Sequence, residues 1–281
     1  MIKRTLVFGQ PAYLSHHHNQ LLVKYPNSKD EKTVAVEDVG FVVLEDPQIT
    51  ISGKLLSALA QNNAVVICCN EKHFPAGMML PFEGHTELNQ RYRLQLESST
   101  PLRKNLWQQI VRQKILNQAT VLKSKNMPYE NMLHWSGEVS SGDTKNHEGR
   151  AAAHYWGQLG TKWPGFTRER SGVPPNGWLN YGYALIRAAI ARSVVSAGLL
   201  PAIGLHHQNK YNAFCMADDL MEPFRPYVDA LVLQLAEKHG LTEELKPEVK
   251  KELLQVLAND VLIDGEKSPL KIGRASCRER V

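Results

Sequence analysis

The chain is poor in cysteine and in long apolar runs. Its 281 residues include four cysteines, none in a C-x-x-C pair: Cys68, Cys69, Cys215 and Cys277. So few cysteines argue against a disulfide framework and favour reduced thiols, and we expect the apolar run that holds Cys68 and Cys69 to lie in the core. The longest apolar runs, AVVICC and VGFVVL, are much shorter than the roughly 18 residues of a membrane span, and MIKRTLVFGQ lacks the apolar region of a signal peptide. We therefore predict a cytoplasmic protein without a membrane partner.

The common fingerprints of nucleotide-binding and hydrolytic sites are also missing. The sequence contains no G-x-G-x-x-G, G-x-x-x-x-G-K-[ST], H-E-x-x-H or G-x-S-x-G pattern. This excludes the usual dinucleotide-binding, P-loop, zincin and serine-hydrolase interpretations. The net charge of +5 permits a nucleic-acid partner but is too small to require one.

Apolar patterning divides the chain near residue 80. Before that point, short runs typical of strands occur at 5–8, 19–25, 32–37, 39–45, 49–52 and 64–69, with one helix over 52–63. After it, helical spacing dominates, and helices are expected over 100–125, from about 147, and over 178–201. We predict an α+β protein with two domains, a small β-rich domain over 1–80 and a larger α-helical domain over 81–271.

Three adjacent histidines, His16 to His18, lie within an expected strand. Neighbouring side chains on a strand point to opposite faces, so three in a row do not converge on one metal ion. We expect no metal site there.

The stretch GLHHQNKYNAFCMADDLMEPFRP, at 204–226, concentrates polar residues. Asp218 and Asp219 precede Glu222 by four and three residues, a spacing that places carboxylates on one side of a helix. Such carboxylates favour a divalent cation between them. Mg²⁺ and Mn²⁺ both accept carboxylate oxygens, and a histidine ligand favours Mn²⁺. The alternative is an acidic helix start in which these side chains cap the helix and complement its dipole.

A further carboxylate, Glu148, is expected in the first turn of the helix that begins near 143–146. A glutamate in a first turn needs no function. However, its neighbourhood is cationic and suited to holding phosphates, since it contains Lys145, His147, Arg150 and His154. A remote glutamate, a histidine and an acidic helix together suit metal-assisted phosphoryl transfer.

Three blocks of the sequence, in order and spacing, resemble one family. The blocks are NHEGRAAAHYW, NYGYALIRAAIARSVVSAGLLPAIGLHH and NAFCMADDLMEPFRP. They resemble the Cas-one family of CRISPR adaptation endonucleases, most closely its type II, II-C-like branch, and the resemblance covers nearly the whole chain. It implies a β-rich N-terminal domain for dimerisation and partner docking, a helical catalytic domain, and homodimers that flank a dimer of the Cas-two protein.

The resemblance also implies which residues form the site. It places a catalytic metal ion, Mg²⁺ or Mn²⁺, on Glu148, His207 and Glu222. It favours His207 over His206 because the family's histidine follows a glycine by three positions and precedes the last glutamate by about fifteen. Asp219 matches a family aspartate, either an accessory ligand or an acceptor that orients His207. The implied reaction, part of antiviral defence, is attack by the 3′-hydroxyl of a prespacer DNA on a phosphodiester of the CRISPR repeat.

The implied partners are double-stranded prespacer DNA and CRISPR repeat DNA. By position, six basic residues are candidates for phosphate contacts, and each has the alternative of an ion pair within the chain: Lys145, Arg150, Arg187, Arg192, Lys210 and Arg225. Two other functions stay open. One is a catalytically impaired DNA-binding scaffold of the same complex, and the other is a metal-dependent nuclease that repairs branched DNA.

The C-terminal end departs from the pattern of the preceding residues. The last ten residues, IGRASCRERV at 272–281, break both the helical pattern and the composition, and we interpret them as a non-native tail. The family's helical domain usually continues past DGEKSPLKIG, so the resemblance implies that a last helix or tail is missing. Glu148, His207 and Glu222 all lie upstream of this point.

Overall fold

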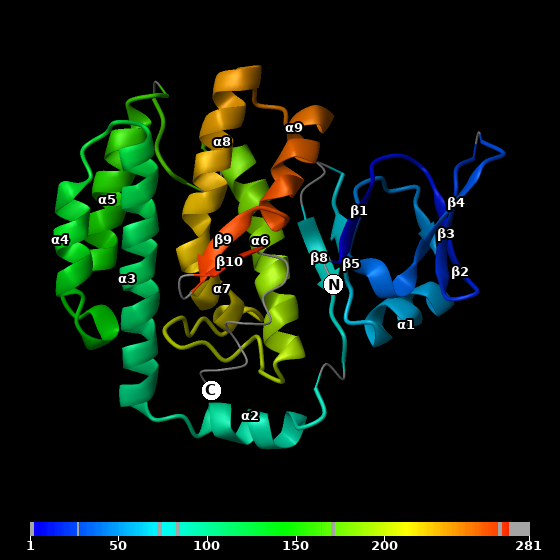
Figure 1. Ribbon diagram of the computed structural model, residues 1–281, viewed down its shortest axis with the longest axis horizontal. Helices are drawn as coiled ribbons and strands as arrows, with labels where there is room; N and C mark the ends of the chain where they lie inside the picture. The colour runs from blue at the N-terminus through cyan, green and yellow to red at the C-terminus, as the bar shows by residue number, and fades with distance from the viewer. Residues whose placement is uncertain are drawn as a thin grey trace. The chain divides into compact units, whose positions relative to one another are not determined.

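The computed structural model describes residues 3–26, 28–71, 75–82, 85–163, 165–169, 172–263 and 266–269 (Figure 1). Its contacts separate two compact units, one of Met1–Tyr92 with Ala188–Leu200 and one of Arg93–Arg187 with Pro201–Leu270. The boundary predicted near residue 80 falls inside the first unit. The tail at 272–281 lies outside the described residues.

The first unit contains two four-stranded sheets. One has the order β1-β5-β7-β8 and is formed by β1 (Arg4–Phe8), β5 (Val39–Leu44), β7 (Val65–Cys69) and β8 (Pro75–Met79). The other has the order β4-β3-β2-β6 and is formed by β4 (Glu31–Ala35), β3 (Gln20–Lys24), β2 (Tyr13–His17) and β6 (Thr50–Ile51). β5 pairs in parallel with both β1 and β7 and is buried along nearly its whole length. This burial on both faces explains why its sequence, VGFVVL, is continuously apolar.

Helix α1 (Gly53–Gln61) closes the core of this unit. The Ser52 side chain accepts a hydrogen bond from the Leu55 amide and caps the helix, and Leu55 and Leu59 are fully buried. The expectation that Cys68 lies in the core was wrong, because its side chain is exposed. β7 leaves the core at its last residues, where the register with β8 shifts between Cys68 and Cys69.

The second unit is mainly helical. It is built from α3 (Thr100–Ser124), α4 (Glu130–Glu138), α5 (His147–Gly160), α7 (Cys215–Met221), α8 (Arg225–His239), α9 (Pro247–Leu253), and parts of α2 (Leu88–Leu96) and α6 (Asn176–Ser196), with the hairpin β9 (Asp260–Ile263) and β10 (Glu266–Pro269). α3 contacts α4, α5 and α8 (Figure 1). The helices expected near 100–125, 147 and 178–201 are confirmed, whereas β8 and α2 were not anticipated. None of the helices in the described ranges is long and apolar enough to cross a membrane.

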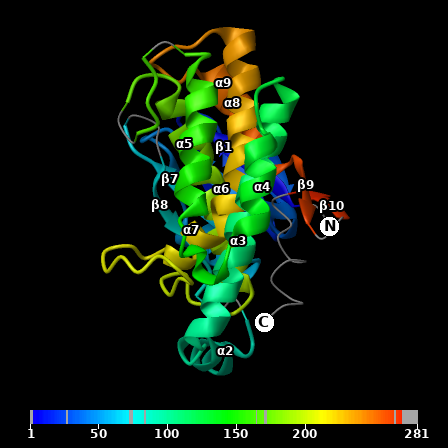
Figure 2. The ribbon, with the colours of Figure 1, turned by 90° about the vertical axis from the view of Figure 1, so that its left-hand side faces the viewer.

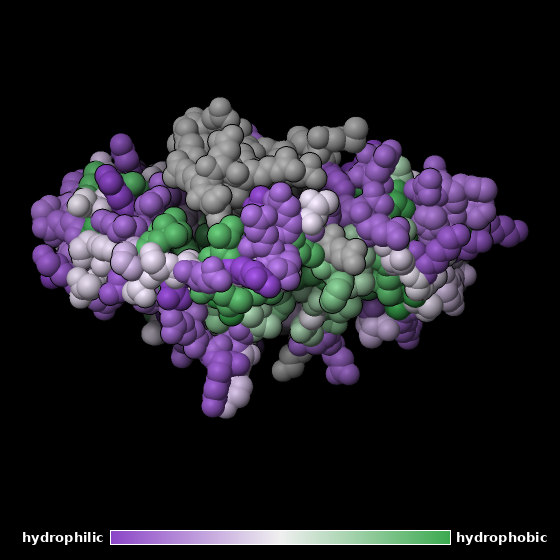
Figure 3. All heavy atoms as spheres, turned by 90° about the horizontal axis from the view of Figure 1, so that it is seen from below, coloured by the Kyte–Doolittle hydropathy of each residue, from purple (hydrophilic) through white to green (hydrophobic). Residues whose placement is uncertain are grey.

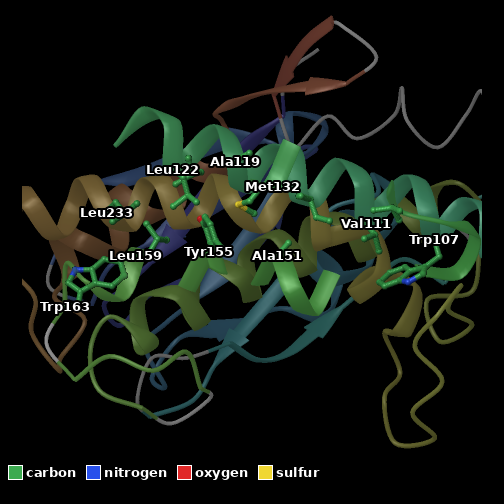
Figure 4. Packing of buried hydrophobic residues seen from close by; sticks show 13 residues of the cluster. Trp107, Val111, Ala119, Leu122, Met132, Ala151, Tyr155, Leu159, Trp163 and Leu233 are labelled. Atoms are coloured by element: carbon green, nitrogen blue, oxygen red, sulfur yellow. The ribbon is translucent and has the colours of Figure 1, made fainter. Parts of the chain in front are cut away.

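The core of the helical unit lies along α3, as Figure 4 shows. Trp107, Val111 and Leu122 of α3 pack with Tyr155 of α5 and Leu233 of α8. α6 and α8 also approach closely, because a Cβ on Gly182 would lie 2.4 Å from Val228 Cγ1. The α+β class, with strands first and helices after them, is therefore confirmed. α3 is the element on which the candidate site is assembled.

Candidate active site

Glu148 is held in the first turn of α5 by two capping side chains. The carboxylate of Asp143 accepts hydrogen bonds from the His147 and Glu148 amides, both at 2.9 Å. Asn146, the N-cap, has a left-handed backbone with φ of 53° and accepts from the Gly149 amide at 3.1 Å. Asp143 and Asn146 thus act together, and they fix the start of the helix that carries Glu148.

Lys114 of α3 joins Glu148 to Glu222. Its Nζ lies 2.7 Å from Glu148 Oε1 and 2.5 Å from Glu222 Oε2, and its side chain is only 13% exposed. Burial by itself lowers the pKa of Lys114, but the charges of Glu222 and Glu148 outweigh burial and raise it. Two carboxylates more than seventy positions apart in the chain therefore share one cation.

Lys114 was not among the residues that the sequence predicted for the site. A signal was present. Lys114 follows Ile110 by four and Val111 by three positions, and both spacings place it on the apolar side of the helix. Val111 is fully buried, and Ile110 packs against the same core. A lysine on such a side needs a partner in the interior.

Glu222 lies in a 3₁₀ turn, Glu222–Phe224, between α7 and α8. Asn117 of α3 donates a hydrogen bond to the Pro223 carbonyl at 2.7 Å and ties this turn to α3. Arg225 Nε lies 2.7 Å from Glu222 Oε1. Burial alone raises the pKa of Glu222, but Arg225 and Lys114 oppose it and lower the pKa below its usual value. Glu222 is therefore a buried, ionised carboxylate.

A buried network stands behind Arg225. Its guanidinium lies 4.6 Å from the centroid of the Tyr183 ring. Tyr183 donates its hydroxyl to Asp229, and Tyr155 donates to the same carboxylate at 2.9 Å. Burial raises the pKa of Asp229 to about 6. This network fixes the side chain that in turn fixes Glu222.

His207 is oriented by Asp219, which is fully buried. The His207 Nδ1 donates to Asp219 Oδ1, and the same carboxylate accepts from the backbone amides of Leu205 at 2.6 Å and His206 at 2.9 Å. The hydrogen bond that His207 donates to Asp219 raises the pKa of His207, and the charges of Asp219, Glu222 and Glu148 raise it further against the effect of burial. Asp219 therefore positions the ring and leaves Nε2 for a ligand.

The chain around this histidine is tightly fitted. A Cβ on Gly204 would lie 2.6 Å from the His207 carbonyl oxygen and 2.8 Å from Asp219 Oδ2, so a larger residue there displaces the loop. His206 stacks on Trp107 of α3, with ring centroids 4.3 Å apart and planes 4° apart. His206 thus anchors the loop, and His207 is the imidazole that Asp219 orients.

The three carboxylates of DDLME have different partners. Asp218 pairs with Arg187 at 2.6 Å, Asp219 holds the loop before His207, and Glu222 pairs with Lys114. α7 ends at Met221, and Glu222 begins the 3₁₀ turn that follows, so the α-helix expected over these carboxylates ends just before Glu222.

The six basic residues predicted to contact DNA form two groups, one with polar partners within the chain and one with exposed side chains. Three have partners within the chain: Arg187 with Asp218, Arg225 with Glu222, and Arg192 with the Asn63 carbonyl. The other three, Lys145, Arg150 and Lys210, are exposed. Of the cationic neighbourhood expected around Glu148, His147 is buried and faces the protein interior.

The described part of the chain presents no ready-made cluster of three His, Cys, Asp or Glu residues around a metal position. What it presents is a cation, the Lys114 ammonium, held between the carboxylates of Glu148 and Glu222. The third donor is the His207 ring, within electrostatic range of both. Two carboxylates and an imidazole form a donor set that suits Mg²⁺ or Mn²⁺, so the residues fit a divalent metal.

Comparison with known proteins places the chain in a family. The family model described as "CRISPR associated protein Cas1" matches residues 5–260. The chain belongs to the Cas1 family. It is 39% identical over 267 residues to the CRISPR-associated endonuclease Cas1 of Neisseria meningitidis serogroup C (strain 8013), which covers 94% of this chain and 86% of that protein.

Solved structures share the fold of this Cas1 chain. A casposase bound to integration product matches 97% of this chain and 87% of its own, with a TM-score of 0.77 and 20% identity. A Cas6-RT-Cas1–Cas2 complex matches 98% of this chain and 34% of its own, with a TM-score of 0.76 and 19% identity. The family resemblance drawn from the three sequence blocks is thus confirmed. The roles of individual site residues stay predictions.

Proposed function

We propose that this Cas1 chain is a metal-dependent DNA endonuclease and integrase of CRISPR adaptation, with Glu148, His207 and Glu222 as ligands of Mg²⁺ or Mn²⁺. The observation that carries the proposal is the shared cation position between Glu148 and Glu222, beside an imidazole that Asp219 orients. The names of its relatives support it, since one is an endonuclease and another was solved with an integration product.

The reaction is a transfer between phosphodiesters. The 3′-hydroxyl of a prespacer strand loses its proton and forms a new P–O bond, the P–O3′ bond of the repeat strand breaks, and the leaving oxygen takes up a proton. A bound divalent ion lowers the pKa of the attacking hydroxyl and neutralises charge on the phosphate. Before an ion binds, Arg225 and Lys114 keep Glu222 ionised, and Asp219 keeps the His207 ring in place. No protein nucleophile is required.

The proposed partners follow from the same assignment. We infer a cytoplasmic homodimer that binds a Cas-two dimer, prespacer DNA and CRISPR repeat DNA, and the Cas1–Cas2 complex among its structural neighbours supports this. Lys145, Arg150 and Lys210 are the basic candidates best placed to meet phosphates, because their side chains are exposed.

The direct test is strand transfer with the full chain. Wild-type protein, with its Cas-two partner, is expected to join a prespacer duplex to repeat DNA in Mn²⁺ and to do so no longer in chelator. His207→Ala is expected to lose the activity and to keep the melting temperature, because the ring is about half exposed. His134→Ala, which removes an exposed imidazole of α4, is the matched control and should change neither quantity. Joining by His207→Ala at the wild-type rate would show that this ligand is wrongly assigned.

Asp219 offers a second prediction, on positioning. Asp219→Ala leaves the Leu205 and His206 amides and His207 Nδ1 without their acceptor, and strand transfer is expected to fall about 10- to 100-fold. Asp219→Asn keeps one acceptor oxygen and should recover part of the rate. Mn²⁺ titration of both variants measures the effect. Equal rates for Ala and Asn would contradict a positioning role.

One observation favours a second candidate function. The Lys114 ammonium occupies the position between the carboxylates of Glu148 and Glu222. If a metal ion never replaces this ammonium, the protein has no catalytic metal and acts as a DNA-binding scaffold of the same complex. Branched-DNA binding in chelator, with no cleavage in Mn²⁺, would favour this scaffold. A repair nuclease differs only in substrate, and location of the gene away from any CRISPR array would favour it.

A further inference from the structure

Tyr211 is an aromatic side chain to which the proposed chemistry assigns no role. It is 86% exposed, whereas most aromatic residues of the helical unit are buried or partly buried. In the view of Figure 3, hydrophilic residues, in purple, make up most of the described surface. A large aromatic ring left in water costs free energy that a binding partner recovers by covering it. Tyr211 is therefore a candidate contact for a ligand.

The loop that carries Tyr211 is fixed at both ends by the acidic residues of α7. At its start, Asp219 accepts from the Leu205 amide at 2.6 Å. Near its end, Asn212 donates to Asp218 Oδ2 at 2.6 Å. Figure 2 shows this loop, in yellow, projecting from the helices. The ring is thus presented to solvent from an anchored loop, which lowers the entropy lost when a ligand binds.

Lys210 completes the chemical character of this loop. Its Nζ lies 4.8 Å from the centroid of the Tyr211 ring, and its side chain is exposed. An aromatic face next to a flexible cation matches a nucleotide, because the ring stacks on the base while the ammonium meets a phosphate. A purely apolar partner surface offers no acceptor or countercharge for the Lys210 ammonium.

The position of Tyr211 limits which nucleotide it can reach. It follows His207 by four residues, so the Cα atoms of the two residues are at most about 14 Å apart. Successive phosphates along one strand of duplex DNA are separated by about 3.4 Å of helix axis, so this backbone separation corresponds to about four nucleotides. The base must also expose a face, as it does at a duplex end or in an unpaired stretch.

We propose that Tyr211 stacks on an unpaired or terminal DNA base within about four nucleotides of the reacting phosphodiester, and that Lys210 contacts a phosphate of the same strand. This inference rests on the proposed function, because it takes the position of the phosphodiester from His207. Its consequence is that the protein binds frayed or single-stranded DNA next to the junction more tightly than a continuous duplex there.

The experiment measures DNA binding in chelator, so that it does not depend on strand transfer. Fluorescence anisotropy with the full chain follows branched DNAs that carry one abasic site, moved across four nucleotides on each side of the junction. Tyr211→Ala is expected to weaken binding about 5-fold to about 150-fold, and Tyr211→Phe to bind like wild type. Phe82→Ala, which removes another highly exposed aromatic ring, is the control and should have no effect.

An abasic site at one position should weaken wild-type binding by the same factor as Tyr211→Ala does on intact DNA. On the DNA with that abasic site, Tyr211→Ala and the wild-type protein should bind with equal affinity. Lys210→Ala should reduce the slope of log Kd against log salt by about 0.7 to 0.9. Binding by Tyr211→Ala within twofold of wild type, or an equal loss at every abasic position, overturns the inference. So does a loss seen only when the Cas-two partner is present, which would make Tyr211 a protein contact. Failure of the wild-type protein to carry out strand transfer in Mn²⁺ would refute the proposed function instead. The binding measurements with abasic DNAs would still test whether Tyr211 stacks on a base.

Discussion

Glu148→Gln is expected to lower metal-dependent strand transfer by about 1000-fold or more while changing the melting temperature by no more than about 4 °C. The substitution removes a ligand charge, and a bound metal ion supplies several kcal/mol of transition-state stabilisation at about 1.4 kcal/mol per tenfold in rate. The fold tolerates the change because Glu148 remains 24% exposed in its side chain and Lys114 keeps its second partner, Glu222. Single-turnover joining assays and thermal unfolding measure the two effects.

Two variants make this result specific. Glu237→Gln removes an exposed carboxylate that pairs with Lys125 beyond the other end of α3, and it should change neither quantity. Glu222→Gln should lose activity and stability together, because it leaves Lys114 and Arg225 buried without a full countercharge. A Glu148→Gln protein that retains more than about a tenth of the wild-type rate would remove Glu148 from the ligand set.

Much of the fold follows from local pattern. The continuous apolar run of β5 and the periodic apolar residues of α3 and α6 each satisfy one dominant requirement, burial, and these elements occur where expected. β8 and α2 were not anticipated because their sequences, PAGMM and LNQRYRLQL, carry weak patterns. In both, tertiary contacts decide the conformation more than local preference does.

The candidate site also combines residues that local sequence patterns identify with residues that only tertiary contacts bring together. Glu148, His207 and Glu222 could be named from sequence blocks, which also contain Asp219 and Arg225, yet the lysine that the two glutamates share lies on a helix that those blocks omit. Lys114 and Asn117 reach the site only because α3 packs beside the 3₁₀ turn at Glu222, which is a long-range contact. In the same way, spacing alone grouped Asp218 with Asp219, whereas Asp218 pairs with Arg187 and Asp219 holds the loop before His207.

Lys114→Met is expected to cost about 3–5 kcal/mol of unfolding free energy in chelator, because it removes the cation between Glu148 and Glu222 and leaves Arg225 as the remaining partner of Glu222. Lys125→Met, which breaks a solvent-exposed pair with Glu237, should cost no more than about 1 kcal/mol. Chemical denaturation of both variants measures the difference. Similar stability of the two proteins would show that the bridge contributes little.

The effect of Mn²⁺ on the melting temperature of Lys114→Met separates the two candidate functions. In wild-type protein a divalent ion has to displace the Lys114 ammonium from Glu148 and Glu222, whereas in Lys114→Met the carboxylates are already free of it. Mn²⁺ should therefore raise the melting temperature of Lys114→Met by more than that of wild type, since a ligand that binds the folded state more tightly stabilises it more. Glu148→Gln combined with Lys114→Met should lose most of this increase. If Mn²⁺ leaves the melting temperature of Lys114→Met unchanged, the carboxylates hold only the lysine and the scaffold function is favoured.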